Sequence, residues 1–257
     1  MEIKILVASH KYYWMPKDKM YLPVWCGAGR EPHTATYGFQ RDDIGNNISS
    51  KNPFFCELTA LYWAWKNLDA KYIGLVHYRR YFAQRLTGEK RSRIAGSESI
   101  FRILKKTPVI LPCKRHYWID TNYGQYVHAH HVEDLIQTRA ILSIKCPEYL
   151  PAYDASMKRT SGHRFNMFVM QRDLLDAYCS WLFGILFELE KRLDISFYSA
   201  NDQRVFGFVG ERLMDCWIET NHIAYTEMPV VNLESQHWLK KGTTFLVRRF
   251  RRKTARL

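Results

Sequence analysis

Residues 72–76 read Tyr-Ile-Gly-Leu-Val, and residues 77–81 continue at once as His-Tyr-Arg-Arg-Tyr. A short apolar run that stops abruptly at polar residues is typical of a buried strand in an α/β sheet. Residues 3–8, Ile-Lys-Ile-Leu-Val-Ala, have the same character. Between these runs, residues 56–68 predict a helix, because a proline precedes it and apolar residues recur at helical spacing: Leu58, Leu61, Tyr62 and Trp65.

The rest of the chain continues this alternation. Apolar residues at helical spacing predict two long helices, one from Leu174 to Leu189 and one from Val205 to Trp217. Shorter helices are predicted at residues 100–105 and 132–143. Extended segments are predicted at residues 109–111, 164–170 and 223–233. The sequence therefore predicts a single α/β domain over residues 1–235, with a mainly parallel sheet flanked by helices.

In parallel sheets of this kind, ligands bind outside the carboxyl ends of the strands. The rule directs attention to the residues just after Val76, Leu111 and Met170. His77, Arg79 and Arg80 follow the first of these strands, and a guanidinium offers a fork of donors that matches phosphate oxygens. These residues are candidates for a diphosphate clamp. The alternative is a set of surface arginines that pair with carboxylates.

Composition excludes several classes of protein. The six cysteines are scattered singly, so no zinc ribbon or redox motif is predicted. The apolar stretch at the N-terminus is too short for a signal peptide, and the most apolar run, residues 181–187, is too short to cross a bilayer. The chain also lacks the glycine-rich phosphate loop, the dinucleotide fingerprint and the nucleophile elbow. We expect a cytoplasmic protein.

The net charge of +13 is concentrated near the C-terminus. No acidic residue follows Glu234, whereas residues 236–257 carry eight lysines and arginines interspersed with apolar residues such as Phe245 and Phe250. Such a tail is attracted to an anionic membrane surface, where each basic residue contributes about 1 kcal/mol. Nucleic acid would attract it too, and a solvated tail without a partner is the third interpretation.

Three further groups of polar residues are candidates for a site. The loop at residues 42–53 runs into the predicted helix, and its side chains could bind a ribose or sugar or merely form turns and caps. His128, His130 and His131 lie near Glu133 and Asp134, and on a helix His130 and Asp134 would share a face, although no third metal ligand can be identified. Asp202 and Glu211 are candidates for a general base, or for a helix cap and an exposed helix residue.

Three groups of segments together resemble a known family. They are residues 43–49 with 56–67, residues 72–82, and residues 166–170 with 181–183, 188–190, 204–208 and 211–213. The sequence resembles, over roughly residues 3–235, the bacterial family first catalogued as a domain of unknown function in capsular and exopolysaccharide gene clusters, and since treated as glycosyltransferases.

The resemblance implies a GT-A-like fold, a nucleotide-sugar donor such as a UDP-sugar, and a lipid-linked oligosaccharide acceptor for capsule, O-antigen or exopolysaccharide. Similar members are associated with galactose or galactofuranose transfer. His77, Arg79 and Arg80 lie where many GT-A enzymes hold a divalent metal with an Asp-x-Asp motif. Because arginines can neutralise a leaving diphosphate directly, we expect metal-independent transfer that requires no cofactor, with manganese or magnesium as the alternative.

The resulting hypothesis is an inverting hexosyltransferase at the inner face of the plasma membrane. A carboxylate deprotonates the acceptor hydroxyl, with Asp202 preferred to Glu211. The predicted donor-binding residues are Asp43, Asn47, Asn52, Glu57, His77, Arg79 and Arg80, and the predicted acceptor or supporting residues are His130, His131 and Asn166. The rival hypotheses are a nucleic-acid-binding module and a non-catalytic scaffold of a polysaccharide assembly complex.

Overall fold

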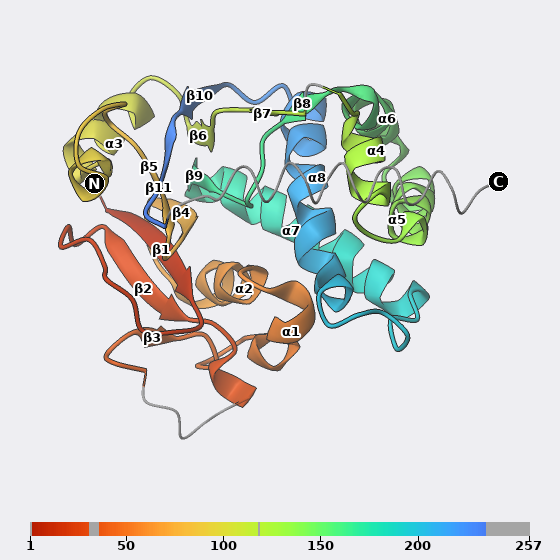
Figure 1. The fold of residues 1–257 in the computed structure, drawn as a ribbon, viewed down its shortest axis with the longest axis horizontal. Coiled ribbons are helices and arrows are strands. Elements are labelled where there is room, and N and C mark those ends of the chain that lie inside the picture. The colour runs from red at the N-terminus through yellow and green to blue at the C-terminus, as the bar shows by residue number, and fades with distance from the viewer. Residues whose placement is uncertain (1, 31–35, 118, 235–257) are drawn as a thin grey trace.

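A computed structural model describes residues 2–30, 36–117 and 119–234 of the chain (Figure 1). The predicted membrane tail, residues 236–257, lies outside the described residues. Within the described part, no helix is long and apolar enough to span a membrane.

The centre of the fold is a sheet whose main path has the strand order β10-β6-β9-β4-β1-β2-β3. The strands of this path are β1 (Ile3–Ser9), β2 (Tyr21–Trp25), β3 (Gln40–Arg41), β4 (Tyr72–His77), β6 (Val109–Pro112), β9 (Phe168–Gln171) and β10 (Tyr225–Met228). Strand β9 runs opposite to both of its neighbours, and the other neighbouring pairs are parallel. The predicted α/β fold with a mainly parallel sheet is therefore confirmed.

Shorter strands and the helices complete the domain. Strands β5 (Arg80–Phe82) and β11 (Val230–Asn232) pair with each other beside β4, and β7 (Arg115–His116) and β8 (Ser161–Gly162) form a separate two-stranded sheet. The helices are α1 (Asn52–Phe55), α2 (Leu58–Asn67), α3 (Ser97–Leu104), α4 (Asn122–Val127), α5 (Val132–Lys145), α6 (Leu150–Lys158), α7 (Arg172–Arg192) and α8 (Val205–Thr220).

Alternation along the strands gives the sheet two buried faces. Leu6 and Leu75 face the core formed with α2, α7 and α8, whereas Ile5 and Val76 face the core formed with α3. Figure 1 shows α2, α7 and α8 gathered on one side of the sheet and α3 on the other. Gly74 allows β4 and β9 to approach closely, since a Cβ there would lie 2.8 Å from the carbonyl oxygen of Phe168.

Two differences from the sequence prediction matter for the site. The helix predicted over residues 56–68 is α2, which begins only at Leu58, and a separate short helix, α1, precedes it; Cys56, with a positive φ of 52°, separates the two helices. The strand predicted over residues 164–170 begins only at Phe168, because left-handed backbone at Phe165 and Asn166 prevents an extended chain there.

The direction of β9 corrects a further expectation. The residues after Met170 were expected at the ligand-binding edge of the sheet. Since β9 is antiparallel to β4, with Phe168 opposite Leu75, its carboxyl end lies at the opposite edge. The residues that precede β9 lie instead beside the carboxyl end of β4.

Candidate active site

A cavity of about 450 Å³ opens at the carboxyl ends of β1 and β4. The loop that follows each strand forms one side, and α1 with the first turns of α8 forms the other. The polar and aromatic residues that line it include Ser9, His10, Asn52, Glu57, His77, Tyr78, Arg79, Arg80, Arg204, Phe208 and Glu211. The residues after Val76 therefore border a cavity, and their binding of a ligand stays a prediction.

Cationic side chains converge on this cavity. Arg79 Nη1 lies 3.2 Å from a carboxylate oxygen of Glu234, and Arg80 donates from Nε to Asn232 Oδ1 at 3.1 Å. Arg204, on the opposite wall, donates from Nε to Cys56 Sγ at 3.1 Å. The other two guanidinium nitrogens of Arg80 make no hydrogen bond to the described residues. A guanidinium in this state can bind an anion that enters the cavity.

The pKa directions reflect this concentration of positive charge. Burial, and then the neighbouring charge of Arg79, lower the pKa of Arg80. Partial burial, followed by the charges of Lys11, Arg79 and Arg204, lowers the pKa of His10 below its ordinary value of 6.5. An anionic ligand would oppose both shifts, because an opposite charge favours the protonated form of each group.

Two carboxylates face the same cavity, Glu57 at the junction of α1 and α2 and Glu211 on α8. Glu57 Oε1 accepts a hydrogen bond from Asn166 Nδ2 at 2.7 Å, and the same amide donates to the carbonyl oxygen of Gly207 at 3.1 Å. Both carboxylates act on Arg80 and Arg204 by favouring their charged forms. The cavity thus combines anion-binding cations with groups that can accept a proton.

His77 is fixed by a backbone carbonyl. Its Nε2 lies 2.6 Å from the carbonyl oxygen of Phe165. Because a carbonyl oxygen can only accept, Nε2 carries the hydrogen, and in the neutral ring Nδ1 is the acceptor. This bond holds the imidazole at the end of β4.

Two of the predicted donor-binding residues, Asp43 and Asn47, lie outside the lining of this cavity and organise the preceding loop. Arg41 donates to both oxygens of Asp43 at 2.9 and 2.7 Å, and this hydrogen bonding is the main cause of the lowered pKa of Asp43. Asn47 donates to the carbonyl oxygen of Asp43 at 2.9 Å. Asn52 does line the cavity, and its amide donates to the carbonyl oxygen of Cys56 at 2.8 Å. A ligand role for Asp43 and Asn47 stays a prediction.

Asp202, His130 and His131 lie together behind the cavity wall. Asp202 Oδ1 is 3.0 Å from His130 Nδ1, and Asp202 Oδ2 is 3.8 Å from His131 Nε2. The His130 ring stacks on Phe208 at 4.2 Å between centroids, and Phe208 lines the cavity. The structure thus brings Glu211 to the cavity but leaves Asp202 outside its lining.

The three side chains predicted at the end of β4 do not form a set of ligands for a divalent metal. Arginine has no lone pair to offer a metal, and His77 is the only ligand type among the three side chains predicted there. His130 and Asp134, predicted to share a face, have separate partners, since Asp134 accepts hydrogen bonds from Tyr126 and Tyr198 at 2.8 Å each. Among the residues described, no three His, Cys, Asp or Glu side chains gather as a set of metal ligands.

Sequence reasoning missed His10, Arg204 and Phe208 as cavity residues. The sequence does indicate His10, because it directly follows β1, just as His77 ends β4. The rule that ligands bind at the carboxyl ends of parallel strands, applied to residues 3–8, would have identified it. Arg204 directly precedes α8, and Phe208 lies in the first turn of that helix. Nothing in their spacing indicates that α8 would lie against the ends of β1 and β4.

Comparison with known proteins places this site in a family. Residues 4–222 match the family described as "Domain of unknown function (DUF4422)". The chain belongs to the DUF4422 family. The cavity residues from Ser9 to Glu211 all fall within the matched range. No curated protein matches the chain.

A solved structure is similar to this DUF4422 protein over most of its length. It is the apo structure of the bifunctional glycosyltransferase WbbM, with a TM-score of 0.83 and 30% sequence identity. The match covers 91% of this chain and 46% of the WbbM chain, so this chain spans about half the length of that protein. The fold of this DUF4422 domain therefore matches a glycosyltransferase fold.

Proposed function

We propose that this protein is a glycosyltransferase that uses a nucleotide-sugar donor. The observation that carries the proposal is the cavity at the ends of β1 and β4, where Arg79, Arg80 and Arg204 face two carboxylates. The likeness of the fold to a glycosyltransferase supports the same class of reaction. Cations can stabilise the negative charge of a leaving diphosphate, and a carboxylate can act as the general base that deprotonates an acceptor hydroxyl.

In the proposed reaction, an acceptor hydroxyl oxygen attacks the anomeric carbon of the donor. The bond between that carbon and the diphosphate oxygen breaks, and the hydroxyl proton passes to a carboxylate, with inversion at carbon. Arg79, Arg80 and Arg204 stabilise the charge that develops on the diphosphate. Glu211 is the proposed base, because it lines the cavity, whereas Asp202 is engaged by His130 and Ser199.

The proposed substrates follow the family resemblance in the sequence. We take the donor to be a UDP-sugar that carries galactose or galactofuranose, and the acceptor to be a lipid-linked precursor of capsule, O-antigen or exopolysaccharide. Transfer is proposed to need no metal, because the side chains at the end of β4 are cations that replace its charge. Transfer should therefore persist in EDTA; loss of activity on chelation, with recovery in manganese or magnesium, would contradict this.

A panel of nucleotide sugars tests the proposal. A ligand that binds only the native state raises its stability by RT ln(1 + [L]/Kd), so the correct donor should raise the melting temperature. UDP-galactose and UDP-galactofuranose should stabilise the protein more than GDP-mannose, and product analysis should then detect sugar transfer. Stabilisation by nucleic acid with steep salt dependence, and by no nucleotide sugar, would instead favour the nucleic-acid-binding hypothesis.

Association with the inner face of the membrane is proposed from the basic C-terminal residues. Eight basic residues at about 1 kcal/mol each set an upper bound on binding to anionic lipid, which salt screening reduces. Deletion of residues 240–257 should release the protein from anionic vesicles in flotation and slow transfer to a lipid-linked acceptor, but spare a soluble acceptor analogue. A truncated protein that floats as well as the full chain would rule out this role.

A further inference from the structure

Two consecutive residues next to the cavity have left-handed backbone conformations. Phe165 has a φ of 77° and Asn166 a φ of 52°. Left-handed backbone is costly for a residue with a Cβ, and most of all for a bulky side chain such as phenylalanine. Such a conformation persists only where the surrounding contacts enforce it, and it concentrates at functional sites.

These two residues contact three charged or titratable groups of the cavity. The Phe165 ring lies 4.5 Å from the guanidinium carbon of Arg80, and its carbonyl oxygen accepts from His77 Nε2. Asn166 donates to the Glu57 carboxylate at 2.7 Å. Two adjacent residues thus contact one cation, one imidazole and one carboxylate of the cavity. Neither residue is itself among those that line the cavity.

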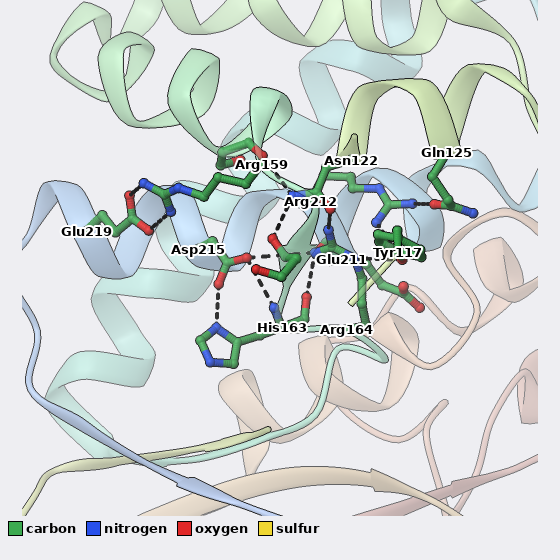
Figure 2. Close-up of polar contacts among 12 residues, drawn as sticks. Tyr117, Asn122, Gln125, Arg159, His163, Arg164, Glu211, Arg212, Asp215 and Glu219 are labelled. Carbon is green, nitrogen blue, oxygen red and sulfur yellow. Dashed lines mark hydrogen bonds and ion pairs between the residues drawn. The ribbon is translucent and has the colours of Figure 1, made fainter. Parts of the chain in front are cut away.

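A buried polar network holds the segment from the other side (Figure 2). Arg164, which is 4% exposed, donates from Nε to Tyr117 Oη at 3.1 Å and from Nη1 to the carbonyl oxygen of His163 at 2.6 Å. Its Nη2 donates to Asn122. His163 contacts Asp215 through both its backbone N and its ring Nδ1.

The same network ties the segment to α8. Arg164 Nη1 donates to the carbonyl oxygen of Glu211 at 3.3 Å and lies 3.7 Å from a carboxylate oxygen of Asp215, another α8 residue. Arg212, the residue after Glu211, shares the Tyr117 hydroxyl with Arg164 at 3.5 Å. Burial would raise the pKa of Tyr117, but the charges of Arg212 and Arg164 outweigh it and lower that pKa. The segment and the helix that bears Glu211 are therefore held as one unit.

We propose that residues 163–166, here called the strap, position the charged groups of the cavity. Phe165 is a positioning residue for Arg80 and His77, and Asn166 is a positioning residue for Glu57. Arg164 anchors the strap so that its strained backbone is maintained. The meaning of this arrangement for sugar transfer rests on the proposed function.

Substitutions at Phe165 test the contact with Arg80, using UDP as the probe in calorimetry. Phe165→Leu keeps an apolar side chain but removes the ring face, and UDP binding should weaken about tenfold. Phe165→Tyr keeps the ring and should bind as the wild type does. Phe101→Leu is the matched control, because the Phe101 ring also contacts a cation, Lys105 at 4.5 Å, but lies on α3 away from the cavity.

A double-mutant cycle separates positioning from general support. If Phe165 acts through Arg80, Phe165→Leu should have no further effect on UDP affinity in an Arg80→Ala background. Equal weakening in both backgrounds would overturn the assignment of Phe165. Wild-type protein that binds no UDP would instead count against the proposed diphosphate site.

A ligand-free measurement keeps the two outcomes distinct. Nitrogen-15 relaxation of Arg80 Nε should report an ordered side chain in the wild type and in Phe165→Tyr, and a mobile one in Phe165→Leu. An Arg80 side chain that stays ordered in Phe165→Leu would overturn the positioning role whether or not UDP binds.

Asn166→Asp tests the contact with Glu57 through a pH profile. The introduced carboxylate would repel Glu57, so turnover relative to the wild type should fall about tenfold at neutral pH. As the pH falls, one carboxyl of the pair takes up a proton and can donate to the other, so relative turnover should recover. Asn67→Asp is the control, since the Asn67 amide donates to the carbonyl oxygen of Trp63 outside the cavity. A relative loss that does not change with pH would overturn the role of Asn166.

Discussion

Two pairs of arginines in this protein perform different work. Arg164 and Arg212 are 4% and 5% exposed, and both donate hydrogen bonds to protein oxygens such as Tyr117 Oη. Arg79 keeps 42% of its side chain exposed, and Arg80 keeps donors without a hydrogen bond within the described residues. The first pair fixes the backbone below the cavity, and the second is available to a ligand. The position of a guanidinium in the fold, more than its chemistry, decides between structure and binding.

The largest expected effect is the loss of protein stability when a buried arginine is substituted. Arg164→Met should lower the free energy of unfolding by about 3–5 kcal/mol, because it leaves buried polar partners uncompensated. Chemical denaturation measures the loss. Arg159→Met is the control, since Arg159 pairs with Glu219 at the surface with 41% of its side chain exposed, and should cost less than about 1 kcal/mol. Equal losses in the two variants would remove the distinction between the buried and the exposed arginines.

Substitution of Arg79 or Arg80 in the cavity should lower the activity of the protein but leave its stability unchanged. Arg80→Ala or Arg79→Ala should lower turnover by about a hundredfold or more, as the loss of a group that stabilises developing charge does. Unfolding curves should stay close to those of the wild type. Wild-type turnover in either variant would remove that arginine from the mechanism, and a large loss of stability would mean that the cavity pair also supports the fold.

The smallest expected effect concerns His10 at the cavity rim. Its lowered pKa means that, below pH 6.5, the unfolded chain binds more protons than the folded chain. His10 therefore destabilises the protein as the pH falls from 6.5 through the lowered folded-state pKa, and this loss is absent above 6.5. In denaturation at about pH 7.5 and about pH 5.5, His10→Gln should lose less stability than the wild type on acidification. An identical pH dependence would show that neither burial nor the positive charge of the cavity lowers the pKa of His10.

Local patterns in the sequence predicted the sheet and one half of the site. The apolar run at residues 72–76 predicted a buried strand, and its abrupt end predicted the position of His77, Arg79 and Arg80 at the cavity. The same rule failed for Met170, because it assumes parallel strands and β9 runs the other way. Strand direction depends on long-range pairing, which a local pattern does not encode.

The sequence by itself determined which segments form helices and which form strands, because periodicity and strand ends are properties of neighbouring residues. Only the tertiary structure decided which distant residues meet. It brings Glu57, Arg80, Arg204 and Glu211 around one space, although they come from three separate parts of the chain. It also gives Phe165 and Asn166 their left-handed backbone. The local preference of phenylalanine is against this conformation. The physical reason is that the buried contacts of Arg164 with Tyr117, Asn122 and α8 form only when the chain has folded, and their combined free energy maintains a local conformation that the segment alone would not adopt.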